Sequence, residues 1–292
     1  MNSGRNRTTL KISLHCLNML KLEPEGCLNR EKDVMEPTLG FIKEMATHAG
    51  GIILQHAVSD FEIQHKSRKD LVTSADHASE TYLIDTIRRA FPHHAINAEE
   101  SGELRGKGDH KWFIDPLDGT INFAHGIPFY CVSIGYAFKG EMTLGVVYDP
   151  NRNECFSAER GQGATLNGSS IHVADQRDLI ECLLATGFPR DVEDTPGDNL
   201  RNFVRLNRSS QTVRRMGSAA LDIAYVAAGR LDGYWSVEIF QWDVGAASLM
   251  VSEAGGLVTD ISGGSDFMTP PVSILCANPT IHARMLSVLE EI

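Results

Sequence analysis

Two aspartates stand three residues apart after an apolar segment, in Trp112-Phe-Ile-Asp-Pro-Leu-Asp-Gly-Thr-Ile-Asn-Phe123. Pro116 biases Asp115 toward the extended conformation that ends a strand, and Asp118-Gly119 predicts a sharp turn. The N–H groups of Gly119 and Thr120 would then begin a helical turn, where unpaired N–H groups favour an anion. Hard cations such as Mg²⁺ prefer carboxylate oxygens and leave coordination positions for water and phosphate. The segment therefore predicts a metal site beside a phosphate site, although Asp-Gly alone is more often a simple turn.

Two further segments place carboxylates near expected strand or helix ends, Ala98-Glu99-Glu100-Ser101 and Trp242-Asp243. Taken singly, each also has a structural interpretation: a glutamate pair suits a solvated surface, and Asp243 suits a helix cap. Thr73-Ser-Ala-Asp76 likewise resembles a capping box at the start of a helix. No EF-hand loop or P-loop motif occurs, and Gly161-Gln-Gly163 lacks the third glycine of a dinucleotide fingerprint. The chemistry indicated by the carboxylates is therefore metal binding rather than nucleotide binding by a glycine-rich loop.

The composition narrows the class of protein. A chain of 292 residues can form one large domain or two intimate subdomains. The formal net charge of -11 argues against sequence-independent nucleic-acid binding, because no excess of basic residues is available to displace counterions. The six cysteines are scattered without a CxxC pair, which predicts reduced thiols and a cytoplasmic location. No apolar run approaches the roughly 20 residues that span a bilayer, so no membrane partner is expected.

The pattern along the chain predicts helices from Pro37 to about Val58 and from near Asp76 to Phe91-Pro92. Strands are expected at about 94–98 and 111–115, followed by an antiparallel meander over residues 130–171. Beyond about residue 180, strands and helices alternate, which indicates helices stacked on a mixed sheet. We therefore expect two layered subdomains, at about 36–180 and 181–292, that share one core. Residues 1–35 are expected to be a disordered or wrongly included extension, with organelle targeting as the alternative.

The order of these segments resembles the inositol monophosphatase family. The resemblance covers about residues 37–290, and its most specific motif is Asp115-Pro-Leu-Asp-Gly-Thr-Ile-Asn-Phe123. The other matching segments are 70–76, 98–102, 161–168, 185–189, 217–220 and 242–243. The resemblance implies an α+β fold with αβαβα layers, usually assembled as a homodimer. It also implies Mg²⁺-dependent and often lithium-sensitive hydrolysis of a small phosphorylated polyol or sugar.

The resemblance further implies roles for particular residues. One Mg²⁺ would be held by Glu99, Asp115 and the Leu117 carbonyl, and a second by Asp115, Asp118 and Asp243. Thr120, hydrogen-bonded near Asp76, would help Glu99 to orient and deprotonate the attacking water. The N–H groups of Gly119 and Thr120 would receive the phosphate, while Glu100 would lie outside the ligand set or be a weaker ligand of a third ion. The backbone near the substrate ring would come from Gly217, Ser218 and Ala219.

The expected substrate-binding glutamate is displaced. Family members acting on inositol phosphate typically have a glutamate seven residues before the helix-opening aspartate, and that position here is Ser236. Glu238 is two residues away and would bind substrate hydroxyls if the strand register holds or a one-residue bulge intervenes. Inositol 1-phosphate is the leading substrate; histidinol phosphate, fructose 1,6-bisphosphate and 3′-phosphoadenosine phosphate are alternatives. A non-catalytic partner role in transcription is the competing function of a different class.

Overall fold

The computed structural model describes residues 36–58, 62–65, 71–188 and 198–290. The chain divides into two units, Met1–Met35 and Glu36–Ile292, and all of the described residues belong to the second. The expectations for residues 1–35 therefore lie outside the described residues, as do Asp70 and Pro189 of the family-like segments. In the described part of the chain, no helix is both long and apolar enough to cross a membrane.

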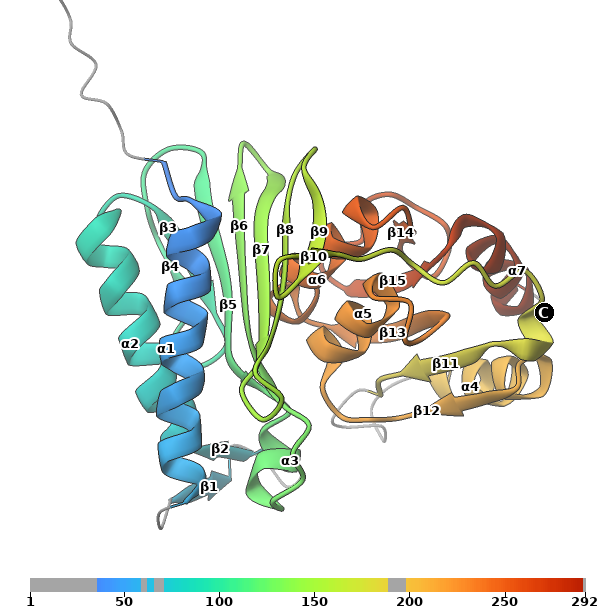
Figure 1. Ribbon diagram of the computed structural model, residues 1–292, viewed down its shortest axis with the longest axis horizontal. Helices are drawn as coiled ribbons and strands as arrows, with labels where there is room; N and C mark the ends of the chain where they lie inside the picture. The colour runs from blue at the N-terminus through green and yellow to red at the C-terminus, as the bar shows by residue number, and fades with distance from the viewer. Residues whose placement is uncertain (1–35, 59–61, 66–70, 189–197, 291–292) are drawn as a thin grey trace, which may run out of the picture. The chain divides into compact units, whose positions relative to one another are not determined.

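Two helices, α1 (Leu39–Ala57) and α2 (Ser74–Ala90), cover one face of the larger sheet (Figure 1). Thr38 caps α1 by accepting a hydrogen bond from the Phe41 N–H at 3.2 Å. The predicted capping box at the start of α2 is confirmed, because Thr73 and Asp76 accept backbone N–H groups reciprocally. The helix ends at Ala90, just before Phe91-Pro92 as predicted, since proline cannot continue it.

The larger sheet has eight strands in the order β10-β9-β8-β7-β6-β5-β3-β4. The predicted meander is confirmed, because β5 through β10 pair antiparallel with their sequence neighbours. Strand β3 instead runs parallel to β5. The strands are β3 (Ala95–Ala98), β4 (Gly102–Leu104), β5 (His110–Asp118), β6 (Cys131–Phe138), β7 (Glu141–Asp149), β8 (Glu154–Glu159), β9 (Gly163–Leu166) and β10 (Ser169–Ser170).

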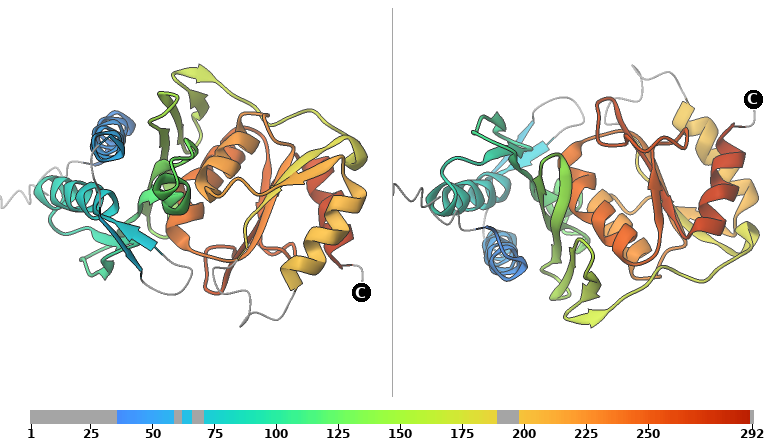
Figure 2. Two further views of the ribbon diagram at one scale, coloured as in Figure 1. Left: turned by 90° about the horizontal axis from the view of Figure 1, so that it is seen from below. Right: turned by 90° about the horizontal axis from the view of Figure 1, so that it is seen from above.

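The smaller sheet has five strands in the order β12-β11-β13-β15-β14, with parallel and antiparallel pairs. Helices α5 and α6 lie between the two sheets, and α4 and α7 cover the outer face (Figure 2). The elements are β11 (Leu183–Thr186), α4 (Asp198–Ser209), β12 (Thr212–Arg214), α5 (Ala219–Ala227), β13 (Gly233–Ile239), α6 (Gln241–Glu253), β14 (Leu257–Thr259), β15 (Val272–Ala277) and α7 (Pro279–Glu290). The mixed sheet with stacked helices predicted beyond residue 180 is thus confirmed.

Three apolar cores hold the layers together. One core joins α1 and α2 to the larger sheet, a second surrounds α5 and α6, and a third lies under α4 and α7. The approach of α6 to the larger sheet is close, because a Cβ at Gly145 on β7 would lie 2.6 Å from the Ala246 carbonyl oxygen. The α+β fold with αβαβα layers is therefore confirmed.

The pattern did not predict several short elements. These are the hairpin of β1 (Ile63–His65) with β2 (Leu71–Thr73), strand β4 and strand β12. Each has only three residues, too few for a period-two pattern to be distinguished from a loop.

Candidate active site

The site begins where β5 loses its pairing with β6. The register passes from Asp115 opposite Ser133 to Asp118 opposite Cys131, so one extra residue bulges out of β5. Pro116 cannot donate to the ladder, while the Leu117 N–H donates to Asp115 Oδ1 at 3.0 Å. This bulge turns both aspartates of the family-like motif toward the same region.

A third carboxylate comes from the first turn of α6. Asp243 Oδ2 accepts a hydrogen bond from the Phe240 N–H at 3.0 Å, so the predicted helix-capping contact is present. Carboxylate oxygens of Asp115, Asp118 and Asp243 lie within 4.8 Å of one another. In the described part of the chain, this carboxylate cluster is the one group of three acidic, histidine or cysteine side chains close enough to share a cation.

Asp118 is oriented by the start of α5. Its Oδ2 atom accepts hydrogen bonds from Ser218 Oγ at 2.6 Å and from the Ala220 N–H at 2.7 Å. The family resemblance implies a backbone role for Ser218 near the substrate, and the structure adds that its side chain holds this carboxylate. The contact spans 100 residues of sequence, so no local pattern indicates it.

Thr120 and Asp76 are brought together as the family resemblance implied. Thr120 Oγ1 lies 3.0 Å from Asp76 Oδ1 and 3.0 Å from the Leu117 carbonyl oxygen. The other oxygen of Asp76 accepts the N–H and hydroxyl of Thr73 at 2.8 and 2.6 Å. The same carboxylate therefore caps α2 and orients the Thr120 hydroxyl.

Glu99 lies on the cavity wall but not within the three-carboxylate cluster. The turn that carries it is fastened to α2, where Glu80 accepts the Glu100 N–H at 2.8 Å and the Ser101 hydroxyl at 2.6 Å. Glu80 could not be predicted from the sequence, because a single glutamate on a helix gives no signal of a contact 20 residues away.

Burial dominates the electrostatics of the cluster. It raises the pKa of Asp115 well above the ordinary value, and Glu99, Asp118 and Asp243 raise it further by repulsion. Burial raises the pKa of Asp118 to about 6, although the Ser218 and Ala220 hydrogen bonds oppose the shift. The pKa of Asp243 rises to about 8 through burial and then repulsion from Asp118 and Glu99. A group of two buried carboxylates and a half-buried third suits a divalent cation, which would remove the repulsion between them.

These shifts predict how the stability of the metal-free protein depends on pH. The folded-state pKa values of Asp118 and Asp243, about 6 and about 8, exceed the ordinary 3.8, so folding favours the protonated forms. Their stabilisation is complete below about pH 4 and is lost as pH rises through about 6 and 8. In EDTA, we expect Tm to fall between pH 5 and pH 8.

Thermal unfolding followed by circular dichroism would measure this change. Mg²⁺ should raise Tm more at pH 8 than at pH 5, and Asp243→Asn should flatten the metal-free decline. A decline of equal size in Asp243→Asn would contradict the assignment of the pH dependence to this cluster.

The carboxylate cluster forms one wall of a cavity of about 1220 Å³. Gly119, Gly217, Ser218, Ala219 and Glu238 also line it, so the predicted substrate-binding residues share one cavity with the predicted metal ligands. Gly119 has φ +100°, and a Cβ there would lie 3.0 Å from the Phe129 carbonyl oxygen. Only glycine accommodates both requirements without strain.

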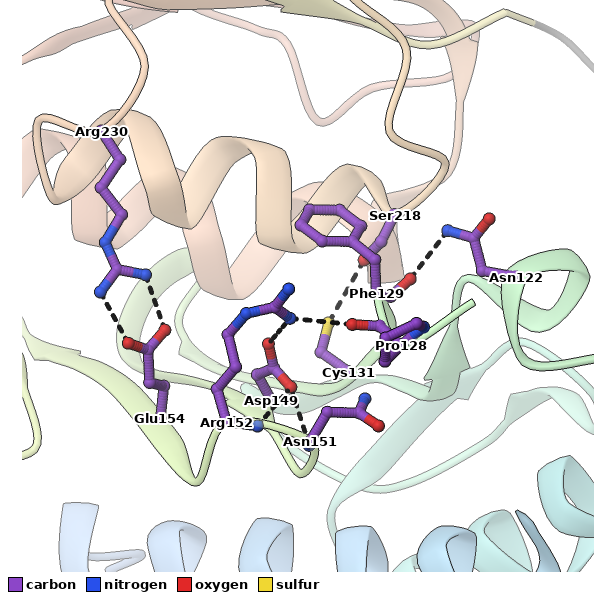
Figure 3. A network of polar contacts seen from close by, with 10 residues as sticks. All are labelled: Asn122, Pro128, Phe129, Cys131, Asp149, Asn151, Arg152, Glu154, Ser218 and Arg230. Atoms are coloured by element: carbon purple, nitrogen blue, oxygen red, sulfur yellow. Dashed lines mark hydrogen bonds and ion pairs between the residues drawn. The ribbon is translucent and has the colours of Figure 1, made fainter. Parts of the chain in front are cut away.

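Asn122 joins the two segments that approach the cavity. Its side-chain amide donates to the Phe129 and Met216 carbonyl oxygens, each at 2.8 Å. Figure 3 shows the first of these contacts, together with the Cys131 thiol pointing to Ser218. Nearby, the buried carboxylate of Asp149 pairs with Arg152 at 2.8 Å (Figure 3). This polar network fixes the loop after α3 (Thr120–Ala124) against the segment that leads into α5.

The bulge anticipated as one option near Glu238 is present in β13. The pairing with β15 shifts between Val237 and Ile239, and Glu238 has a left-handed backbone with φ +52°. The Glu238 side chain is exposed and lines the cavity, whereas Ser236 is buried. The extra residue thus changes the direction of Glu238 relative to a regular strand.

Comparison with known proteins agrees with this geometry. The model of the inositol monophosphatase family matches residues 34–292, and the chain belongs to this family. It is 43% identical over 256 residues to the Nus factor SuhB of Escherichia coli (strain K12), covering 87% of this chain and 96% of that protein.

Two solved structures have a similar fold over most of the chain. The extragenic suppressor protein suhB from Bartonella henselae has a TM-score of 0.81 at 37% identity, covering 86% of this chain and 97% of that chain. The inositol monophosphatase from Anabaena (Nostoc) sp. PCC 7120 has a TM-score of 0.77 at 42% identity, covering 86% and 94%.

Proposed function

We propose that this protein is a Mg²⁺-dependent phosphatase that hydrolyses a small phosphate monoester, with inositol 1-phosphate as its substrate. The observation that carries the proposal is the cluster of Asp115, Asp118 and Asp243 on the wall of a substrate-sized cavity. Membership of the inositol monophosphatase family supports the phosphatase activity. The 42% identity to the inositol monophosphatase of Anabaena supports the choice of substrate.

The residues present fit the metal. In addition to the three clustered aspartates, Glu99 and Leu117 line the same cavity and would offer a carboxylate and a carbonyl oxygen as ligands. Bound Mg²⁺ ions would neutralise phosphate charge, acidify a water molecule and stabilise the departing alkoxide.

The protein's own groups would supply the remaining steps. The Asp76 carboxylate orients the Thr120 hydroxyl, and this hydroxyl would hold the attacking water against Glu99, which accepts its proton. The N–H groups of Gly119 and Thr120 would receive phosphate oxygens. Glu238 would accept hydrogen bonds from substrate hydroxyls, which is supported by its exposed position on the cavity wall.

A phosphate-release panel tests the proposal. The purified chain would be assayed with inositol 1-phosphate, histidinol phosphate, fructose 1,6-bisphosphate and 3′-phosphoadenosine phosphate, each with Mg²⁺ and with EDTA. The highest kcat/KM is expected for inositol 1-phosphate, and only with Mg²⁺. Preference for another member would replace the substrate, whereas no release from any would overturn the phosphatase proposal.

A partner role in transcription is a second candidate function, supported by the similarity to relatives named Nus factor SuhB. Such a role would use the outer surface rather than the carboxylate cluster. An affinity-tagged chain and its Asp115→Asn variant should then capture the same transcription proteins from extract, measured by mass spectrometry against a tag-only control. Failure to enrich any transcription protein above that control would dismiss this role.

A further inference from the structure

Two buried polar atoms beside the carboxylate cluster have no hydrogen-bond partner of acceptable geometry among the described residues. These are Asp222 Oδ1 on α5 and the Tyr234 hydroxyl on β13, and the two side chains are 1% and 0% exposed. A buried polar group without a partner costs about 1–3 kcal/mol, so such groups are uncommon in a folded interior. Both residues line the cavity, so a ligand bound there would supply the missing hydrogen-bond partners.

The two atoms share their surroundings with Ser236. Tyr234 and Ser236 are two residues apart on β13 and therefore face the same side of the sheet. Burial raises the pKa of the Tyr234 hydroxyl and the Asp222 carboxyl adds to the rise, whereas the neighbouring Ser236 hydroxyl lowers it. All three residues line the cavity that contains the carboxylate cluster. The contact of Ser236 Oγ with the Val237 carbonyl oxygen is long, at 3.5 Å, so a substrate hydroxyl would replace it at little cost.

Gly187 lies against this group and follows directly after β11, the strand that pairs with β13. A Cβ built on Gly187 would lie 2.9 Å from the Tyr234 hydroxyl and 3.0 Å from Ser236 Oγ. Both hydroxyl oxygens therefore lie close to one point beside Gly187, and a side chain on Gly187 would occupy that point. Gly187 has no positive φ, so its backbone does not itself require glycine.

We propose that Asp222, Tyr234 and Ser236, closed by Gly187, form an inner polar pocket that binds a hydroxyl group of the substrate alcohol. The inference rests on the proposed phosphatase function and deepens it, because it selects esters of polyols over esters of simple alcohols. A hydroxyl group both donates and accepts, which suits a carboxyl group and two hydroxyls. Binding would satisfy the Asp222 and Tyr234 atoms that have no partner within the described fold.

Two variants test the inner polar pocket without altering a candidate metal ligand. Gly187→Ala places a methyl group where the substrate hydroxyl would lie, and Tyr234→Phe removes one partner. Each should raise KM for inositol 1-phosphate by up to about tenfold, the equivalent of one hydrogen bond. KM for phenyl phosphate, which carries no hydroxyl, should stay within about twofold of the original, as expected where no hydrogen bond is lost.

Thermal unfolding and binding of free myo-inositol give readouts that do not depend on turnover. Because the Tyr234 hydroxyl has no partner within the described fold, Tyr234→Phe should leave Tm unchanged or raise it, while weakening inositol binding in calorimetry. A lower Tm, equal KM increases for both esters, or unchanged inositol binding would overturn the pocket. Absence of hydrolysis of both esters by the original protein would instead overturn the phosphatase function, with calorimetry still deciding the pocket.

Discussion

Replacing Asp115 by Asn is expected to lower Mg²⁺-dependent kcat/KM by about 10³-fold or more, because metal stabilisation of the transition state is worth several kcal/mol. The substitution removes one carboxylate charge from a cluster in which Glu99, Asp118 and Asp243 already repel it. We therefore expect metal-free Asp115→Asn to unfold at the same temperature as the original protein or higher. The loss of activity would then be a loss of chemistry and not of folding.

Phosphate release measured at several Mg²⁺ concentrations, with circular dichroism of the same samples, would check both expectations. Asp175→Asn is the matched control, because the Asp175 side chain is 94% exposed, pairs with Arg177 at 3.7 Å and is not among the residues that line the cavity. Activity of Asp115→Asn equal to that of Asp175→Asn would contradict the site. A large fall in metal-free Tm would show that Asp115 supports the fold instead.

Replacing Thr120 by Val is expected to lower kcat by about 10²- to 10⁴-fold, the usual contribution of general acid–base groups. Valine keeps the shape of the side chain but removes the hydroxyl that lies 3.0 Å from Asp76 Oδ1. The buried Asp76 oxygen loses a partner, so Tm should fall as well. KM should change less than kcat, because the hydroxyl would act on the attacking water and not on the substrate alcohol.

Thr120→Ser is the control for this prediction. Serine restores the hydroxyl and should recover most of the kcat, while losing only a methyl group that is largely buried. Steady-state kinetics of the two variants under identical Mg²⁺ would separate the outcomes. Equal losses in Thr120→Ser and Thr120→Val would indicate that the methyl group's packing matters and that the hydroxyl does not orient water.

The layered fold explains how carboxylates from distant parts of the chain meet in one cavity. Asp115 and Asp118 come from the end of a strand in the larger sheet, whereas Asp243 comes from a helix between the sheets. The start of α5 holds Asp118 from that same middle layer. The cluster therefore depends on the packing of α5 and α6 against the larger sheet, and not on any single loop.

Local signals in the sequence were enough for most of the elements. The capping box before α2, the proline after it and the turns of the meander each depend on residues within a few positions of one another, so they were predicted correctly. The carboxylate motif around Asp115 was also visible, because its chemistry lies in nine consecutive residues. Its family resemblance supplied the distant members Glu99 and Asp243.

Contacts between residues far apart in the chain could not be predicted from the sequence. Ser218 holds Asp118 across 100 positions, and Asn122 reaches Met216 across 94. Glu80, Asp222 and Tyr234 gave no signal, since a glutamate or aspartate on a helix and a tyrosine on a strand are ordinary residues there. What distinguishes them is their position in the folded protein, where Glu80 holds the Glu99 turn and the other two are buried at the cavity.

Thus the sequence by itself determined the order of the main elements, the layered class of fold and the chemistry to be expected of the Asp115–Thr120 segment. It left open the direction of Glu238, because a strand register and a one-residue bulge predict different faces. Only the tertiary structure decided that the bulge exists, and that Asp222, Tyr234 and Gly187 meet beside the carboxylates. The physical reason is that hydrogen-bond capping and turn formation act over a few residues, whereas burial and close approach are properties of the packed layers.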